Sequence, residues 1–122
     1  MGVRPAFPAT AGKKEMKRGN VVWVNLTDTF PPEMGKMRPG IIISNTDHNG
    51  ILETVVIIPL SSRAPEIWPL RVRIAVGTKK PSFAIIPGLR QVSKARLHEV
   101  IGIASEETTE SLFAAATAYL SD

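Results

Sequence analysis

Short runs of β-branched and aromatic residues, each ended by turn-forming residues, constrain the fold of this chain most strongly. Such runs are typical of strands joined by tight connections. They occupy residues 21–26, 41–44, 53–60, 68–76, 82–86 and 100–104. One helical segment follows them, residues 106–120, and Ser105 before it is a residue type that caps helices. Strands followed by one long terminal helix favour a mainly β (α+β) fold, a small antiparallel sheet or partly open barrel with helices packed against it.

Two of these segments also predict how the strands are buried. Residues 21–26 are apolar on both faces of the expected strand, which favours a central strand covered on both sides. In residues 68–76, apolar residues alternate with polar ones, and Arg71 and Arg73 fall on the polar side. This alternation predicts a half-buried strand with a basic outer face.

Length and composition indicate one folded domain. A chain of 122 residues with 43% hydrophobic residues is long enough to bury a core. Residues 1–15 contain Pro and Gly without periodicity and are expected to form a flexible extension before a domain at 16–122. No apolar run approaches the length of a membrane span, so no membrane partner is expected. The chain has no cysteine, which fits a reducing, cytoplasmic location.

Charge is distributed unevenly along the chain. The formal net charge is +4, and Lys and Arg greatly outnumber acidic residues between Lys36 and Arg96. The acids gather near the C-terminus, at Glu99, Glu106, Glu107 and Glu110. This pattern favours a surface that binds a polyanion, although a basic surface that only aids solubility explains charge alone equally well. Base stacking is expected from Phe30 and Phe83, because Trp23 and Trp68 are expected in the core.

The segment from Met34 to Ser44 carries the main candidate for chemistry. A loop with turn-forming residues leads through Arg38 and Pro39 into an isoleucine-rich strand. If this strand and residues 53–60 are antiparallel neighbours, Arg38 and Ser61 lie at the same rim of the sheet. A guanidinium fork beside a hydroxyl suits a phosphate oxygen. The alternative for Ser61 and Ser62 is a turn in which the hydroxyls bond to the backbone.

Other common site chemistries lack their sequence patterns. His48 and His98 are far apart and neither begins a His-Glu-x-x-His helix, so no metal site is expected. No Walker-type loop, dinucleotide-binding glycine pattern or Gly-x-Ser-x-Gly elbow is present, and no cofactor is expected. When the 2′-hydroxyl of RNA attacks the neighbouring phosphate, negative charge develops on the phosphate oxygens. An arginine side chain stabilises this charge without a metal.

Four segments, in the correct order, resemble the MazF/PemK/Kid family of toxin endoribonucleases. They are Met16–Leu26, Glu33–Ser44, Val56–Ser62, and Arg90–Leu97 followed by Ile101-Gly102. The likeness covers about residues 16 to 120. It implies an SH3-like, partly open antiparallel barrel with a C-terminal helix, working as a homodimer. It also implies metal-independent, sequence-specific cleavage of single-stranded mRNA to 2′,3′-cyclic phosphate and 5′-hydroxyl ends, and inhibition by a cognate antitoxin.

The resemblance assigns roles to individual residues. Arg38 matches the family's catalytic arginine, Ser61 matches a position that is usually threonine, and Glu33 matches a loop glutamate near the substrate groove. The residues expected to bind RNA are Lys36, Ser62, Arg63, Arg71, Arg73 and Arg90.

The sequence departs from the family pattern near the expected site. Pro87 and Gly88 stand where many members have Asp-Gln, Met34 replaces a glutamine, and Ser93 replaces an aspartate. Two alternatives therefore stay open: a divergent homologue that binds RNA or a partner without cleaving, and a gyrase poison like the CcdB toxins, which share this fold. The Arg38-Pro39 loop and the Ser61 hydroxyl favour the RNA-directed function.

Overall fold

The structure is a computed structural model that describes residues 16–63, 65–75 and 81–122. The strands are β1 (Asn20–Asn25), β2 (Met37–Ile42), β3 (Thr54–Ser61), β4 (Arg71–Ile74), β5 (Ser82–Ile85), β6 (Arg90–Ser93) and β7 (Leu97–Ile103). The helices are α1 (Thr46–Ile51) and α2 (Glu106–Leu120), with short 3-10 turns η1 (Ile86–Gly88) and η2 (Lys94–Arg96). The predicted extension at 1–15 lies outside the described residues.

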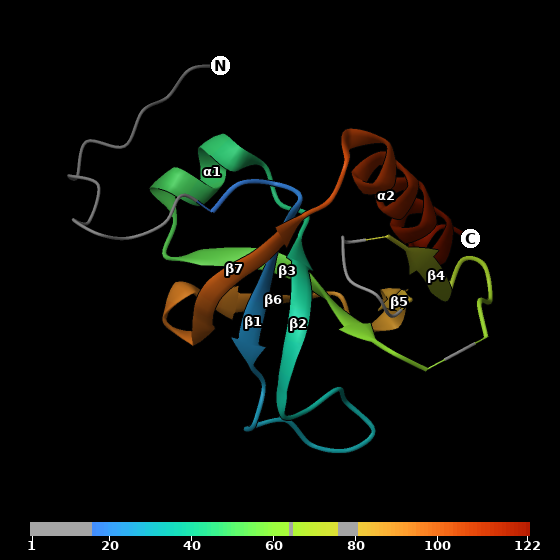
Figure 1. Cartoon of the computed structure of the whole chain (residues 1–122), viewed down its shortest axis with the longest axis horizontal. Coiled ribbons are helices and arrows are strands. Elements are labelled where there is room, and N and C mark those ends of the chain that lie inside the picture. Colours follow the sequence, from blue (N-terminus) through green and yellow to red (C-terminus); the bar gives the residue numbers. More distant parts are fainter. Residues whose placement is uncertain (1–15, 64, 76–80) are drawn as a thin grey trace.

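All paired strands run antiparallel, in the order β4-β5-β3-β2-β1-β7, with β6 pairing β3 as well. The seven-stranded sheet curves but does not close, and α2 lies beside β4 and η1 (Figure 1). The predicted mainly β fold, a partly open antiparallel barrel with a C-terminal helix, is confirmed.

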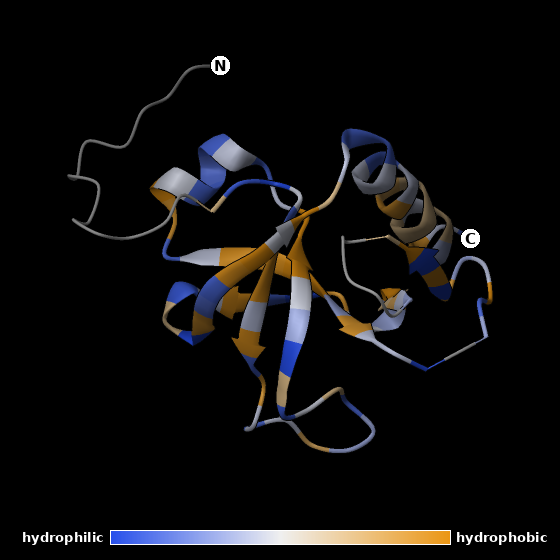
Figure 2. Ribbon diagram, in the orientation of Figure 1, coloured by the Kyte–Doolittle hydropathy of each residue, from blue (hydrophilic) through white to orange (hydrophobic). Residues whose placement is uncertain are grey.

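Two hydrophobic clusters cover the opposite faces of the central strands. One contains Val21 and Ile41 and packs against Leu112 of α2. The other contains Val22 and Val24 of β1 and extends to β3 and β6. The prediction that β1 is a central strand covered on both faces is therefore confirmed. Figure 2 shows that β2 changes from hydrophilic to hydrophobic along its length, as it leaves the preceding loop and enters the core.

Side-chain caps begin the terminal helix, as the sequence predicts at Ser105, and the turn before β7. The hydroxyl of Ser105 accepts a hydrogen bond from the Thr108 N–H at 3.1 Å, which satisfies a free donor in the first turn of α2. Ser93 accepts one from the Ala95 N–H at 3.1 Å and begins η2 in the same way.

The half-buried strand predicted at 68–76 is shorter than expected. Ile67 and Arg71 exchange backbone hydrogen bonds and close a turn before β4 begins. The turn carries Trp68 at its tip, so this side chain is 54% exposed and its predicted place in the core is wrong. Phe83 on β5 is buried, which also makes it unavailable for stacking, whereas Phe30 is exposed as expected.

Two further boundaries differ from the sequence prediction. Residues 45–50 are rich in turn formers such as Asn, Asp and Gly, which favour a loop between the two predicted strands. The Asn45 side chain instead accepts hydrogen bonds from the Asp47 and His48 N–H groups and starts α1. The second strand begins at Met37 rather than Ile41, because residues 37–41 continue the ladder with β1. Arg38 therefore lies inside a paired strand, opposite Val24. Neither helix in the described ranges is long and apolar enough to cross a membrane.

Candidate active site

A groove with a cavity volume of about 360 Å³ opens between the β1–β2 loop and the segment that joins β5 to β6. The loop contributes Asp28, Thr29, Glu33 and Met34, and Leu26 lies at its base. The opposite wall consists of Pro59, Pro87, Gly88, Leu89 and Arg90. The groove thus has apolar surfaces for a planar group and charged side chains of both signs at its margin.

Hydrogen bonds within the loop give residues 27–36 a defined shape. The Thr29 hydroxyl contacts the carbonyl oxygens of Leu26 at 3.0 Å and Met34 at 3.2 Å. Glu33 Oε1 accepts a hydrogen bond from the Phe30 N–H at 2.9 Å, and the Glu33 N–H donates to the Phe30 carbonyl at 2.8 Å. The predicted catalytic Glu33 is therefore at the groove, with one oxygen engaged in holding its own loop.

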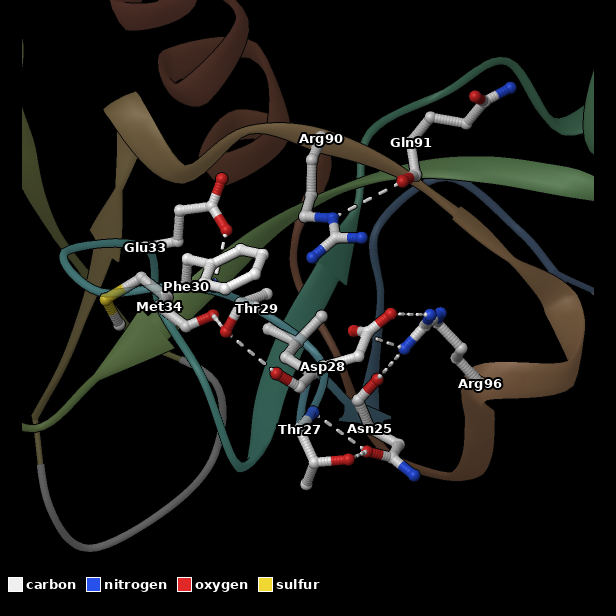
Figure 3. Close-up of polar contacts among 11 residues, drawn as sticks. Asn25, Thr27, Asp28, Thr29, Phe30, Glu33, Met34, Arg90, Gln91 and Arg96 are labelled. Atoms are coloured by element: carbon white, nitrogen blue, oxygen red, sulfur yellow. Dashed lines mark hydrogen bonds and ion pairs between the residues drawn. The ribbon is translucent and has the colours of Figure 1, made fainter.

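An ion pair joins this loop to η2, the turn that leads into β7 beside β1. Both oxygens of the Asp28 carboxylate accept hydrogen bonds from the Arg96 guanidinium, and the Nη1–Oδ1 distance is 2.8 Å. The same Nη1 donates to the Asn25 carbonyl oxygen at 3.1 Å (Figure 3). Arg96 thus holds the end of β1 and the start of the loop at once. We call this pair the Asp28–Arg96 clamp.

The clamp keeps Asp28 ionised. Hydrogen bonding to Arg96 is the main reason that the pKa of Asp28 lies below its usual value of 3.8, and the charges of Arg96 and Arg90 act in the same direction, while desolvation opposes them. Because the folded-state pKa is lowered, this interaction stabilises the fold above about pH 3.8. The contribution is lost as the pH falls through the lowered pKa.

Arg38 and Ser61 lie at one rim of the sheet, as the antiparallel pairing predicts. Gly40 pairs with Pro59, and extending that register by two residues in each strand brings Arg38 opposite Ser61. Arg38 pairs with Val24 on the other side, so it shares the sheet face on which Leu26 and Pro59 border the groove. Arg38 itself does not line the groove; its Nε donates to the Gly35 carbonyl at 2.7 Å.

Ser61 also makes the turn contact that was the structural alternative to a functional role. Its Oγ accepts a hydrogen bond from the Arg63 N–H at 3.1 Å, while its own O–H is not used in that contact. The Ser61 hydroxyl can accept this hydrogen bond at the strand end and still donate one to a ligand, because a hydroxyl is both an acceptor and a donor.

The residues predicted to bind RNA form two groups. Arg90 lines the groove and extends from β6 toward the loop (Figure 3). The others lie outside the groove lining: Lys36 in the loop just before β2, Ser62 and Arg63 after β3, and Arg71 and Arg73 on β4. Arg71 Nη1 donates to the Arg63 carbonyl at 3.2 Å, so these two basic residues lie side by side.

Lys36 has a φ of 72°, a left-handed backbone conformation that residues other than Gly, Asn and Asp rarely adopt. We expect Lys36→Gly to raise the free energy of unfolding by up to about 1 kcal/mol, because glycine has no Cβ to strain this backbone. Lys36→Asn, which tolerates the conformation, separates the loss of charge from the relief of strain. Urea denaturation measures both variants, and a lower unfolding free energy for Lys36→Gly contradicts the expectation.

The chain matches a known protein family over almost its whole length. Residues 17–120 match the family model described as the PemK-like, MazF-like toxin of type II toxin–antitoxin systems. The match spans nearly the whole described chain. The chain belongs to this toxin family.

Solved structures of MazF toxins have the same fold as this MazF-like chain. MazF from Deinococcus radiodurans superposes with a TM-score of 0.78 at 21% identity, over 88% of this chain and 98% of that one. The Mycobacterium tuberculosis toxin MazF-mt6 gives 0.69 at 18% identity, over 84% and 98%. An endoribonuclease from Mycobacterial species, in complex with its cognate antitoxin, gives 0.70 at 20% identity, over 85% and 93%.

Three of the four residues by which this MazF-like chain departs from the family pattern, Met34, Pro87 and Gly88, line its groove. The fourth, Ser93, lies outside the groove lining and caps η2. A Cβ on Gly88 would lie 2.6 Å from Cγ of Pro59 and 3.5 Å from Cγ of Met34, so the two walls meet closely here. Pro87, which precedes Gly88 in the groove lining, has no acidic side chain. The groove therefore contains an apolar contact where a carboxylate and an amide were expected from the family pattern.

Sequence reasoning missed the clamp. In the sequence, Asp28 is one of several turn-forming residues in a long loop, and Arg96 is one of many basic residues between positions 36 and 96. The two residues are 68 positions apart, and no local spacing relates them. Within the described part of the chain, no three His, Cys, Asp or Glu side chains gather as metal ligands would.

Proposed function

We propose that this protein is a toxin endoribonuclease of a type II toxin–antitoxin system that acts in the cytoplasm on single-stranded mRNA, at specific sequences and without a metal. The reaction forms a bond between the RNA 2′-oxygen and phosphorus and breaks the bond between phosphorus and the 5′-oxygen; the 2′-hydroxyl gives up its proton to a base, and the leaving 5′-oxygen takes a proton up from water. The products are a 2′,3′-cyclic phosphate and a 5′-hydroxyl end.

The observation that carries the proposal is the position of Arg38 at the sheet rim, on the face where the groove opens and opposite Ser61. A guanidinium stabilises the charge that develops on the phosphate oxygens. The Ser61 hydroxyl is available to contact the same phosphate. Glu33 is the groove carboxylate proposed to accept the proton of the 2′-hydroxyl, and Arg90, Lys36, Ser62, Arg63, Arg71 and Arg73 are proposed to contact the RNA strand.

One observation favours a second candidate, an RNA-binding homologue that does not cleave. Both carboxylates of the groove are engaged: Glu33 Oε1 with the Phe30 N–H, and Asp28 with Arg96. Pro87 provides no replacement acid. Positioned acid–base help is typically worth roughly a hundredfold or more in rate, so a toxin without it would bind RNA and cleave it slowly at most.

End-mapping of RNA distinguishes the two functions. Purified protein is incubated briefly with a long single-stranded RNA in excess chelator, and the fragment ends are sequenced and tested for a cyclic phosphate. Cleavage at a short recurring sequence with 5′-hydroxyl ends supports the endoribonuclease. Intact RNA that nevertheless binds with steep salt dependence supports the binding function instead.

A homodimer and an antitoxin are part of the proposal, and an exposed apolar surface supports a protein partner. Ile103 on the edge strand β7 is 73% exposed, and Phe113 on α2 is 62% exposed. Ile103 pairs with Asn20, and the Arg18 guanidinium lies 5.9 Å from the centre of the Phe113 ring, so both apolar side chains lie near the start of β1. Exposed apolar side chains that lie near one another indicate a binding face. We assign this face to a second copy of the chain.

Light scattering tests the dimer. We expect the unmodified chain to have twice the monomer mass, and Ile103→Asp to shift it toward the monomer because a charge would be buried without a partner. Ser111→Asp, on an exposed position of α2, is the control and should leave the mass unchanged. A monomeric unmodified chain contradicts the assignment.

A further inference from the structure

We propose that Asp28 and Arg96 are positioning residues: their clamp fixes the β1–β2 loop as one wall of the groove and so keeps Arg38 and Glu33 in place for RNA cleavage. This inference rests on the proposed function. It adds two residues to the site, neither of which touches the reacting phosphate in the proposed reaction.

The loop is a single unit that is attached to the sheet at few points. Its internal bonds, through Thr29, Phe30 and Glu33, define its shape but do not join it to another element. At its base the Leu26 N–H donates to the Lys36 carbonyl at 2.8 Å. The Asp28–Arg96 clamp connects the start of the loop to η2, 68 positions away in the sequence. Figure 3 shows this connection beside the groove-lining side chains.

The geometry of the clamp suits positioning better than general stabilisation. A pair with side-chain exposures of 29% for Arg96 and 55% for Asp28 contributes little to global stability when it is an ordinary surface contact. Here the guanidinium fork binds both carboxylate oxygens and the Asn25 carbonyl, which restricts direction as well as distance. Lysine would supply the charge without the planar fork.

The consequence for the site follows from the loop's contents. The loop carries Glu33 into the groove, and its Gly35 carbonyl accepts the hydrogen bond from Arg38 Nε. If the clamp is removed, the loop that positions Glu33 and the Gly35 carbonyl is no longer fixed to η2. A displacement of about 1 Å in a catalytic group lowers a rate by roughly a hundredfold. RNA binding changes in the opposite direction, because loss of the Asp28 charge makes the groove more positive.

The experiment compares Asp28→Asn, Arg96→Lys and the exchanged pair Asp28→Arg with Arg96→Asp. Lys94→Ala, which removes a charge from the same 3-10 turn, is the matched control. For Asp28→Asn we expect a cleavage rate at saturating RNA about tenfold to a hundredfold lower, with RNA affinity unchanged or higher. Arg96→Lys should also be slow, the exchanged pair should recover much of the rate, and Lys94→Ala should retain it.

Other outcomes overturn the proposal. An unchanged rate at saturating RNA, with only a lower melting temperature, means that the pair is merely structural. A slow exchanged pair whose loop is ordered means that Asp28 acts through its own carboxylate. Hydrogen exchange of the loop amides is measured in the same variants. If these amides exchange no faster in Asp28→Asn than in the unmodified chain, the clamp does not hold the loop in place. This measurement needs no cleavage, so intact RNA with the unmodified chain refutes the proposed function separately.

Discussion

Replacing Arg38 with alanine is expected to lower the rate of RNA cleavage by about a hundredfold to a thousandfold, which is typical for the loss of one preorganised charge at a transition state. Arg38 is held on a paired strand and bonded to the Gly35 carbonyl, so little reorganisation is needed when charge develops on the phosphate. The measurement is a single-turnover cleavage rate at saturating single-stranded RNA in excess chelator.

Two variants make this result specific to Arg38. Arg38→Lys keeps the charge but loses the fork, and we expect an intermediate rate. Arg63→Ala removes an exposed cation after β3 and should weaken RNA binding while leaving the saturated rate nearly unchanged. Circular dichroism checks that each variant is folded. Cleavage by Arg38→Ala at the rate of the unmodified chain would sink the assignment of Arg38 as the catalytic arginine.

Replacing Leu112 with alanine is expected to lower the free energy of unfolding by about 2–5 kcal/mol. Leu112 is fully buried where α2 packs against η1 and β4, and removal of its side chain leaves a cavity among well-packed neighbours. Urea denaturation followed by circular dichroism measures the change. The protein concentration must be constant, because the stability of a dimer depends on it.

The neighbouring residue supplies the control for Leu112. Ser111 is exposed on the same helix, and Ser111→Ala should change the free energy of unfolding by no more than about 0.5 kcal/mol. A loss below about 1 kcal/mol for Leu112→Ala, similar to the control, would mean that α2 does not close the core.

Much of the fold was predictable because its signals are local. The apolar faces of β1 and the cap at Ser105 depend on residues within a few positions of one another, and the structure has both. Where a local signal competed with a contact elsewhere, the prediction was wrong. Trp68 continues an alternating pattern, yet the Ile67–Arg71 bridge turns the chain and exposes it.

The candidate site was predictable only in part, for the same reason. The prediction that Arg38 and Ser61 share a rim needed only that β2 and β3 be antiparallel neighbours, because the start of one strand then lies beside the end of the other. The groove was not predictable, since its walls come from the β1–β2 loop and from the segment around η1, which pairing rules do not relate.

The sequence by itself determined the approximate positions of most strands, the terminal helix with its cap at Ser105, and the membership of the MazF-like toxin family. These properties depend on backbone propensities, side-chain alternation and motif order, all of which are written along the chain. Only the tertiary structure decided that Asp28 meets Arg96 and that Pro87 and Gly88 face Met34 across the groove. Contacts between distant residues depend on how loops pack on the finished sheet, and spacing along the chain carries no information about that packing.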